Sequence, residues 1–257
     1  MGVFRFKRFV VANERSAMKV NTDGVLLGVA MTIKPSDRHL LDVGTGTGTI
    51  ALIAAQRLSE MVAFPKESSD DNICRQHSSD IQAIDIDEAS ASEAAENFRN
   101  SPWDTMLSAL NITLDDYSST LAPTKRFDHI FSNPPYFEDS LQAPEQRRND
   151  SRHTSTGLSY RELLEFAKER LTESGRISLV LPADTEAALT RYARMCGLHL
   201  FRIVRVRTVP RKQPVRIIAE FSFQRCDSPS DETLIIQSEG RYTEEYLAIT
   251  RDFYLFA

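Results

Sequence analysis

The chain has 257 residues, of which 41% are hydrophobic and 26% charged, a composition typical of a globular protein with a sizeable core. A formal net charge of −5 argues against a protein coated with nucleic-acid-binding charge. The three cysteines and five histidines are scattered, so we expect no disulfides, no metal site and a cytoplasmic location. No apolar stretch approaches the ~20 residues of a membrane helix, and we expect neither a membrane span nor a secretory signal.

The first half of the chain alternates between apolar runs and helical patterns. We expect strands at 39–43, 81–86, 111–114 and 128–132, and helices at about 49–58 and 88–100. Phe4, Phe6 and Phe9 alternate with cationic residues, which predicts an N-terminal strand with one buried face. Residues 59–80 are polar and have loop composition, so they predict an insertion between a helix and the next strand.

The second half continues the alternation and then becomes rich in strands. We expect helices at 160–171 and 185–196, a turn at 173–175, a strand at 176–181, and long β runs at 198–209 and 215–224. Alternating strands and helices indicate an α/β fold with a parallel, doubly wound sheet, and the last two runs predict an antiparallel hairpin at its edge. We therefore predict a single domain over 1–257, with an N-terminal extension at 1–35 and a C-terminal addition at 225–257.

The motif LLDVGTGTGTIAL, Leu40–Leu52, places glycines directly after a buried strand. Such glycines permit a tight turn and let the backbone approach a ligand at the N-terminus of the next helix. Gly44, Gly46 and Gly48 have the spacing G-x-G-x-G. A dinucleotide fingerprint would need glycine in place of Thr49, and a P-loop would need Gly-Lys-Ser/Thr, so the spacing excludes both.

With Asp42 two residues ahead of the first glycine, the pattern resembles motif I of the class I methyltransferases, which bind S-adenosylmethionine. The resemblance implies that the loop, including Thr45, wraps the methionine part of this cofactor. It also implies that Asp42 lies close to the amino group of the cofactor. A turn with glycines that serve only flexibility is the alternative interpretation.

Acidic residues follow the next two predicted strands. In nucleoside-binding α/β folds, an acidic residue that ends the second strand accepts hydrogen bonds from the ribose hydroxyls. We predict that Asp85 has this role, with the adjoining Ile86 also at the cofactor, whereas Asp87 is better placed to cap the following helix. One of Asp115 and Asp116 is expected to face the adenine amine, and we favour Asp116; a solvated turn is the alternative for this pair.

The stretch FSNPPYFED, Phe131–Asp139, follows the fourth predicted strand. A proline restricts the residue before it to extended conformations, so Asn133 is held extended at the carboxyl end of that strand. The Asn133 side-chain oxygen and the Pro134 carbonyl oxygen are acceptors of constrained direction, which suits a planar exocyclic amine. With Tyr136 stacked on the substrate, we predict Asn133, Pro134, Pro135 and Tyr136 as catalytic residues and Asn133 also as a cofactor contact. A plain turn is the alternative.

Nearly the whole chain resembles the bacterial tRNA methyltransferases that make N6-methyladenosine at position 37 of a valine tRNA. The matching text is FRFKRFVVANERSAMKVNTDGVLLG, LLDVGTGTGTIAL, ENFRNSPW, FSNPPYF and the closing FYLF. The resemblance implies a Rossmann-like class I methyltransferase fold with a mostly parallel, seven-stranded sheet, S-adenosylmethionine as cofactor and a tRNA partner. It places Lys19, Thr22 and Asp23 near the methionine end of the cofactor, and we expect a monomer.

Two basic segments are candidate RNA contacts. Residues 144–157 are expected to close over a flipped base. The candidate residues there and just before are Phe137, Arg147, Arg148, Arg152 and His153. A second strip, expected to bind the anticodon stem, contains Arg202, Arg205, Arg207, Arg211, Lys212 and Arg216. The alternatives are a solvated loop for the first segment and, for the second, an edge hairpin whose charges prevent strand addition.

Several functions share this amine chemistry. Methylation of the glutamine amide of release factors is one alternative, although those enzymes carry a helical N-terminal domain and the glycine loop here begins too early for it. Methylation of guanine N2 in ribosomal RNA or of adenine in DNA remains open, because the acceptor geometry is similar. A non-enzymatic S-adenosylmethionine-binding RNA interaction module is the remaining alternative.

Overall fold

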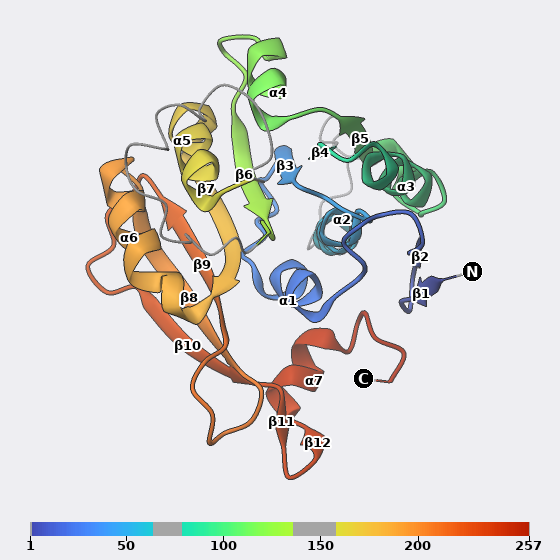
Figure 1. The fold of residues 1–257 in the computed structure, drawn as a ribbon, viewed down its shortest axis with the longest axis vertical. Coiled ribbons are helices and arrows are strands. Elements are labelled where there is room, and N and C mark those ends of the chain that lie inside the picture. Colours follow the sequence, from blue (N-terminus) through green and yellow to red (C-terminus); the bar gives the residue numbers. More distant parts are fainter. Residues whose placement is uncertain (1, 64–78, 136–157, 257) are drawn as a thin grey trace, which may run out of the picture.

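The central sheet contains eight strands within residues 2–63, 79–135 and 158–256, which this computed structural model describes. Their order is β10-β8-β9-β7-β6-β3-β4-β5 (Figure 1). The bounds are β3 (His39–Val43), β4 (Asp80–Asp85), β5 (Leu107–Asn111), β6 (Phe127–Ser132), β7 (Leu171–Pro182), β8 (His199–Arg207), β9 (Arg216–Ser222) and β10 (Ser230–Ile235). Strand β9 runs antiparallel to both of its neighbours, and the other pairs of this sheet are parallel, which confirms the mostly parallel α/β fold.

Helices cover both faces of the sheet (Figure 1). One face carries α1 (Thr22–Ala30), α2 (Thr49–Ala63), α3 (Glu88–Arg99) and α7 (Glu244–Thr250); the other carries α4 (Leu114–Thr120), α5 (Tyr160–Arg170) and α6 (Glu186–Met195). Because side chains alternate between faces along a strand, Leu40 joins the first core cluster while Leu41 and Val43 join the second. Both faces of β3 are therefore buried, as predicted for this strand.

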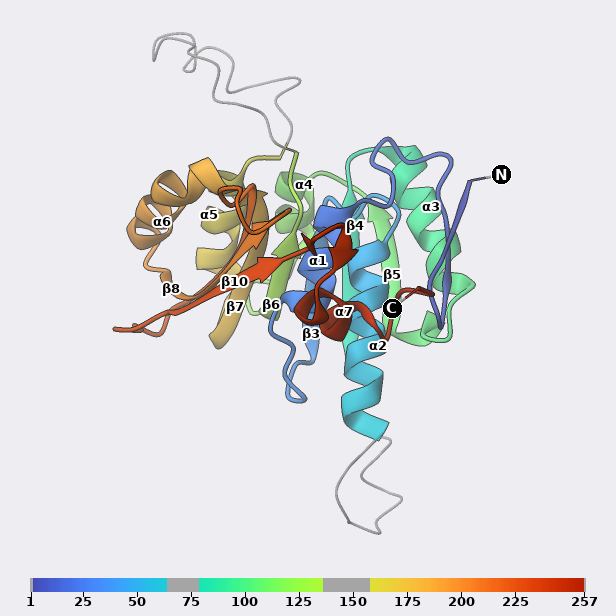
Figure 2. The ribbon, with the colours of Figure 1, turned by 90° about the horizontal axis from the view of Figure 1, so that it is seen from below.

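The N-terminal and C-terminal segments pack into the first of these cores. Strands β1 (Val3–Arg5) and β2 (Val10–Ala12) form an antiparallel pair, and Phe6 and Phe9 beside them are buried. Phe6 bridges to Tyr254, with their ring centroids 6.0 Å apart. Helix α7 lies beside α1 (Figure 2). The remaining short elements are η1 (Asp104–Met106), η2 (Ala183–Thr185), β11 (Gln237–Ser238) and β12 (Arg241–Tyr242).

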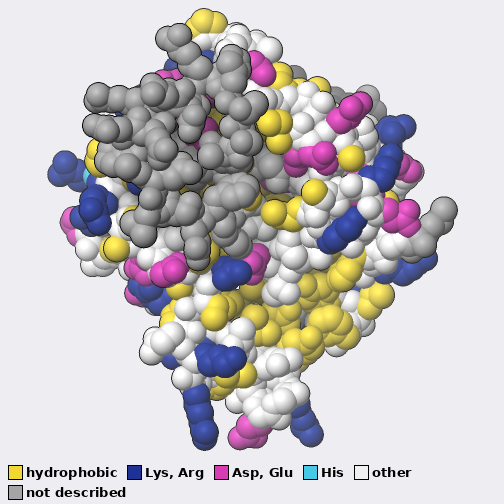
Figure 3. Space-filling view, viewed as in Figure 1, with side chains coloured by type: hydrophobic (Ala, Val, Ile, Leu, Met, Phe, Trp, Pro, Cys, Tyr) yellow, Lys and Arg dark blue, Asp and Glu magenta, His cyan; other side chains and the backbone are white. Residues whose placement is uncertain are grey.

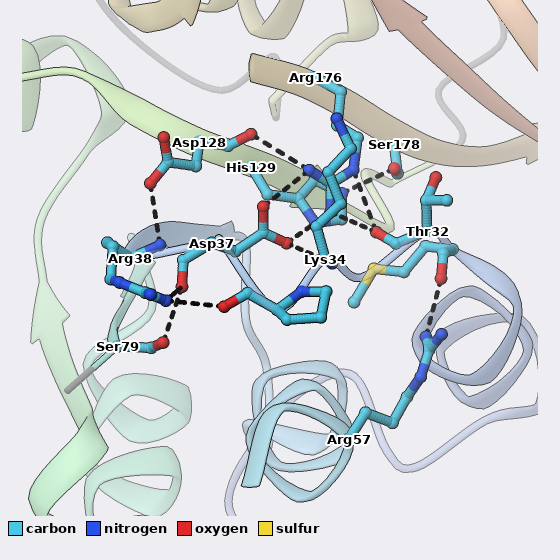
Figure 4. Close-up of polar contacts among 12 residues, drawn as sticks. Thr32, Lys34, Asp37, Arg38, Arg57, Ser79, Asp128, His129, Arg176 and Ser178 are labelled. Atoms are coloured by element: carbon cyan, nitrogen blue, oxygen red, sulfur yellow. Dashed lines mark hydrogen bonds and ion pairs between the residues drawn. The ribbon is translucent and has the colours of Figure 1, made fainter. Parts of the chain in front are cut away.

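A buried ion pair ties the linker between α1 and β3 to the sheet (Figure 4). The two terminal guanidinium nitrogens of Arg176 on β7, Nη1 and Nη2, donate to the Asp37 carboxylate at 3.0 and 2.6 Å. Both side chains are almost fully buried. Arg176 also donates to the Thr32 carbonyl, and His129 on β6 bonds Ser178 at 2.7 Å. A bidentate pair that is satisfied on all sides fixes geometry, so this network holds the linker against the amino ends of the strands.

Three sequence predictions of local structure need correction. Residues 111–114 are not a strand: β5 ends at Asn111, and the Thr113 side chain accepts the Asp116 N–H and starts α4. Residues 173–175 lie within β7, where the pairing register with β6 shifts. Helix α2 runs to Ala63, so the first part of the predicted insertion is helical, and its residues 64–78 lie outside the described residues.

The hairpin of β8 and β9 forms as predicted, but it does not lie at the edge of the sheet. Strand β10 pairs in parallel with β8 and becomes the edge, so the sheet has eight described strands where we expected seven. The added strand satisfies backbone groups of β8 that would otherwise face solvent. No helix within the described residues is long and apolar enough to cross a membrane.

Candidate active site

A cavity of about 320 Å³ opens where β3, β4 and β6 end. Parallel strands bring their carboxyl ends to one edge of a sheet, which is where α/β folds bind ligands. Its lining includes Ala17, Met18, Gly44, Gly46, Asp85, Ile86, Asp87, Ile112, Leu114, Asp115, Asn133, Pro135, Leu158 and Glu162. A smaller adjoining space of about 20 Å³ shares Met18, Gly44, Gly46 and Asn133 and adds Lys19, Asn21 and Thr45. The glycine loop and the end of β6 thus meet in one place, as predicted.

The glycine loop requires its glycines for two different reasons. All three have positive φ, at 70°, 57° and 81° for Gly44, Gly46 and Gly48. At Gly48 a Cβ atom would also lie 2.4 Å from Cε1 of Phe98 on α3. The third glycine therefore lets α3 pack tightly against the start of α2, while the first two line the cavity.

Asp42 lies beneath this loop and not on the cavity surface. Its side chain is fully buried, and Oδ2 accepts a hydrogen bond from the Thr45 hydroxyl at 2.7 Å. Burial raises the pKa of Asp42 to about 7, although the Thr45 hydrogen bond lowers it. Asp42 does not line either space of the site, so its observed contact supports a role in bracing the loop.

Asp85 connects the end of β4 to the glycine loop. Its Oδ2 accepts from the Gly46 N–H at 2.8 Å and its Oδ1 from the Asp87 N–H at 2.9 Å. Burial raises the pKa of Asp85, while these two backbone N–H groups oppose the change. Each carboxylate oxygen has a second lone pair, so Asp85 keeps acceptor capacity toward a ligand in the cavity that it lines.

The structure distinguishes between the acidic candidates. Asp115 lines the cavity, whereas Asp116 does not and its carboxylate accepts from the Thr113 hydroxyl at 2.8 Å. The preference for Asp116 is therefore not supported, because that side chain belongs to the cap of α4, and the lining favours Asp115 as the residue that faces the adenine amine. Asp87 caps α3 by accepting the Ser90 N–H at 2.8 Å, as predicted, and also lines the cavity.

Asn133 is buried at the end of β6, and its amide nitrogen faces the N-terminal segment. Its amide nitrogen donates to Asn21 Oδ1 at 3.4 Å and lies 3.8 Å from Met18 Sδ. Pro135 lines the main cavity, and Pro134 is buried between them. Tyr136 and Phe137 lie outside the described residues, as do Arg147, Arg148, Arg152 and His153.

Only one of the three cofactor contacts predicted in the N-terminal segment lines the site. Lys19 lines the smaller space, but Thr22 and Asp23, in the first turn of α1, line neither space. Asp23 instead pairs with Arg216 on β9 at 2.7 Å. The first turn of α1 points part of its polar surface toward the sheet, so the prediction for Thr22 and Asp23 is not supported by this geometry.

Most of the predicted basic strip is engaged within the protein. Arg205 pairs with Glu186 on α6 and with Asp231 on β10, and Arg202 pairs with Glu220 and Glu232. Arg207 Nη1 donates to the Pro210 carbonyl at 3.4 Å. Arg202 and Arg205 thus join β8 to its neighbours, which neither of the two predicted roles anticipated. Arg211 and Lys212 are exposed beyond the end of β8, and on the visible described surface basic and acidic side chains are interspersed (Figure 3).

Several cavity residues have no sequence signal that identifies them. Leu158 and Glu162 come from the start of α5, and Ile112 from the segment after β5. Asn21 had a local signal, because a polar residue before an apolar run predicts a helix N-cap, and its Oδ1 accepts the Gly24 N–H at 2.8 Å. No sequence signal predicts the contact between Asn21 and Asn133, because it forms only in the folded chain.

The cavity fits S-adenosylmethionine, the cofactor that motif I implies. Apolar side chains of Ile86, Ile112 and Leu158 suit an adenine ring, and Ile86 is 74% exposed beside them. The Asp85 carboxylate suits ribose hydroxyls. The smaller space shares Gly46 and Asn133 with this cavity, so the lining of the two spaces suits a nucleoside with an attached chain.

The chain is similar to known methyltransferases. Residues 29–209 match the family model described as RMKL-like, methyltransferase domain. A tRNA1(Val) (adenine(37)-N6)-methyltransferase from Bacteroides fragilis is 38% identical over 252 residues, covering 98% of this chain and 97% of its own. The Salmonella enteritidis protein of the same name is 38% identical over 255 residues, covering 98% and 95%. A predicted O-methyltransferase from Agrobacterium tumefaciens shares the fold, with a TM-score of 0.59, 15% identity and coverage of 90% and 96%. The chain belongs to the tRNA1(Val) (adenine(37)-N6)-methyltransferase family.

Proposed function

We propose that this protein transfers a methyl group from S-adenosylmethionine to the exocyclic N6 of adenosine 37 in a valine tRNA. The observation that carries the proposal is the position of Asn133, which lines the same cavity as Gly44, Gly46 and Asp85. A fixed amide at the end of β6 is thereby next to the predicted cofactor site. Full-length relatives at 36–38% identity that carry this name support the choice of substrate.

The reacting nitrogen is a poor nucleophile, because its lone pair is delocalised into the adenine ring. The Asn133 amide oxygen and the Pro134 carbonyl oxygen accept its two N–H groups and draw it toward tetrahedral geometry. S-adenosylmethionine supplies an electrophilic methyl group when it is bound. A neutral asparagine is sufficient because the amine needs orientation and polarisation, and no strong base is required.

Substrate contacts follow from the same arrangement. We propose that Tyr136 stacks on the target base and that Phe137, Arg147, Arg148 and Arg152 contact the surrounding RNA. Among the described residues, Arg211 and Lys212 are exposed and are proposed to contact the phosphate backbone. The arginines held by carboxylates are not part of this proposal.

The decisive experiment compares wild type with Asn133→Ala on undermodified tRNA. We expect turnover to fall by at least about 100-fold while cofactor affinity, measured by calorimetry, changes by less than about threefold. Incubation with labelled S-adenosylmethionine and separate pools of tRNA, ribosomal RNA, DNA and release factor then identifies the substrate. Label recovered only in guanine or in a protein glutamine would refute the proposed substrate, and unchanged turnover of the variant would refute the proposed role of Asn133.

A further inference from the structure

Hydrogen bonds join the segment before α1, at residues 12 and 14–16, to helix α3. The Glu93 carboxylate, which is 1% exposed, accepts the backbone N–H groups of Glu14 and Arg15 at 2.8 and 2.9 Å through Oε1, and that of Ser16 at 2.9 Å through Oε2. Burial raises the pKa of Glu93, but these backbone donors outweigh it and leave the pKa below its ordinary value. The carboxylate therefore remains ionised and holds three consecutive residues in place.

Further hydrogen bonds join this segment to α3, join α3 to the glycine loop, and brace the segment internally. The Asn97 side chain accepts the Ala12 N–H at 2.7 Å and donates to the Ala12 and Thr47 carbonyls at 3.1 and 2.9 Å. The Ser16 hydroxyl donates to the Met18 carbonyl at 3.0 Å. Because Thr47 belongs to the glycine loop, hydrogen bonds join the segment, the loop and α3 into one unit.

Asn21 is the point at which this unit reaches the reacting centre. Its Oδ1 caps α1 by accepting the Gly24 N–H at 2.8 Å and also accepts from the Asn133 amide nitrogen at 3.4 Å. The cap fixes the position of Oδ1, since the N–H groups of the first helical turn point toward it. Asn21 Oδ1 thus accepts one of the free N–H groups at the start of α1 and also a hydrogen bond from the Asn133 side chain.

The contact determines which end of the Asn133 amide acts as an acceptor. An asparagine amide presents an oxygen and an NH2 group of nearly equal size, and rotation about its last torsion by half a turn exchanges them. With the NH2 group directed at Asn21 Oδ1, the oxygen lies on the opposite side of the amide. The reversed orientation would present two donors to an amine that itself donates, and it would place two oxygens together at Asn21.

We propose that Asn21 is a positioning residue that holds the Asn133 amide with its oxygen toward the substrate amine. The inference rests on the proposed function and extends it to a residue outside the NPPY motif. It assigns to the N-terminal segment a part in turnover beyond forming a wall of the cavity. Because Asn21 acts through Asn133, its loss should lower kcat at saturating cofactor.

Two substitutions at one position separate this role from helix capping. Serine is as good an N-cap as asparagine but is too short to reach Asn133 as well, whereas aspartate retains an oxygen for both partners. At saturating cofactor and tRNA we expect Asn21→Ser to lower kcat roughly tenfold to 100-fold. We expect Asn21→Asp to recover most of the lost turnover, and both variants to keep the wild-type Tm.

Each outcome decides between the two roles. A kcat for Asn21→Ser within about twofold of wild type overturns the inference, and so does a loss of turnover that is matched by a loss in Tm. Failure of Asn21→Asp to recover turnover also overturns it. Asn133→Ala measured in parallel separates the two proposals: full activity of that variant refutes the proposed chemistry, whereas its inactivity beside a normal Asn21→Ser refutes only the role of Asn21.

Discussion

Substitution of Gly48 by alanine tests whether the glycine loop is built by close packing. The residue has φ of 81°, and an added Cβ would lie 2.4 Å from Cε1 and 2.9 Å from Cζ of Phe98. Alanine in the left-handed region costs about 1–2 kcal/mol. Overpacking against a buried ring adds roughly 1–3 kcal/mol, because Phe98 is only 1% exposed and has little room to move. The free energy of unfolding should therefore fall by about 2–5 kcal/mol, a large part of the total for a domain of this kind.

Gly197→Ala is the matched control. Gly197 has φ of 77°, but among the described residues no atom lies within 4 Å of the position that an added Cβ would take, so it isolates the backbone cost. Urea unfolding followed by circular dichroism should show a loss of about 1 kcal/mol for Gly197→Ala and a clearly larger one for Gly48→Ala. Only Gly48→Ala should also weaken cofactor binding in calorimetry. Equal losses for the two variants would show that the contact with Phe98 does not constrain the loop.

The remaining predictions concern charge. The raised pKa of Asp42, about 7, means that the folded protein binds a proton more tightly than the unfolded chain, so its contribution to stability is present below about pH 4 and is lost as pH rises to 7. Relative to Asp42→Asn, wild type should lose roughly 4 kcal/mol between pH 4 and 7 in urea titrations, and parallel pH profiles would contradict this. Replacing Arg211 and Lys212 by glutamine should raise the KM for tRNA and flatten its salt dependence at unchanged cofactor affinity. Arg205→Gln should change tRNA binding less and lower stability by no more than about 1 kcal/mol, since its pairs are partly exposed; a larger effect on tRNA than on stability would restore it as an RNA contact.

Local signals predicted the elements that depend on neighbouring residues. The strand His39–Val43 has the predicted bounds, because apolar residues at 40, 41 and 43 favour a buried strand and the following glycine permits the turn that ends it. Asp87 caps α3 as predicted, since capping needs only a polar side chain and the next backbone N–H groups. The predicted strand at 111–114 was wrong because the cap by Thr113, also a local signal, outweighed the apolar residues beside it.

The sequence by itself determined the fold class and the cofactor, and it predicted the amine-binding motif, since each depends on residue spacing along a continuous stretch. Only the tertiary structure decided that Asp115 rather than Asp116 lines the cavity, that Arg205 is held by carboxylates, and that Asn21 reaches Asn133 across 112 positions of the chain. These contacts join segments whose relative positions are set by sheet order and helix packing. Because a side chain acts on whatever folding brings within a few ångströms of it, no pattern along the chain specifies such partners.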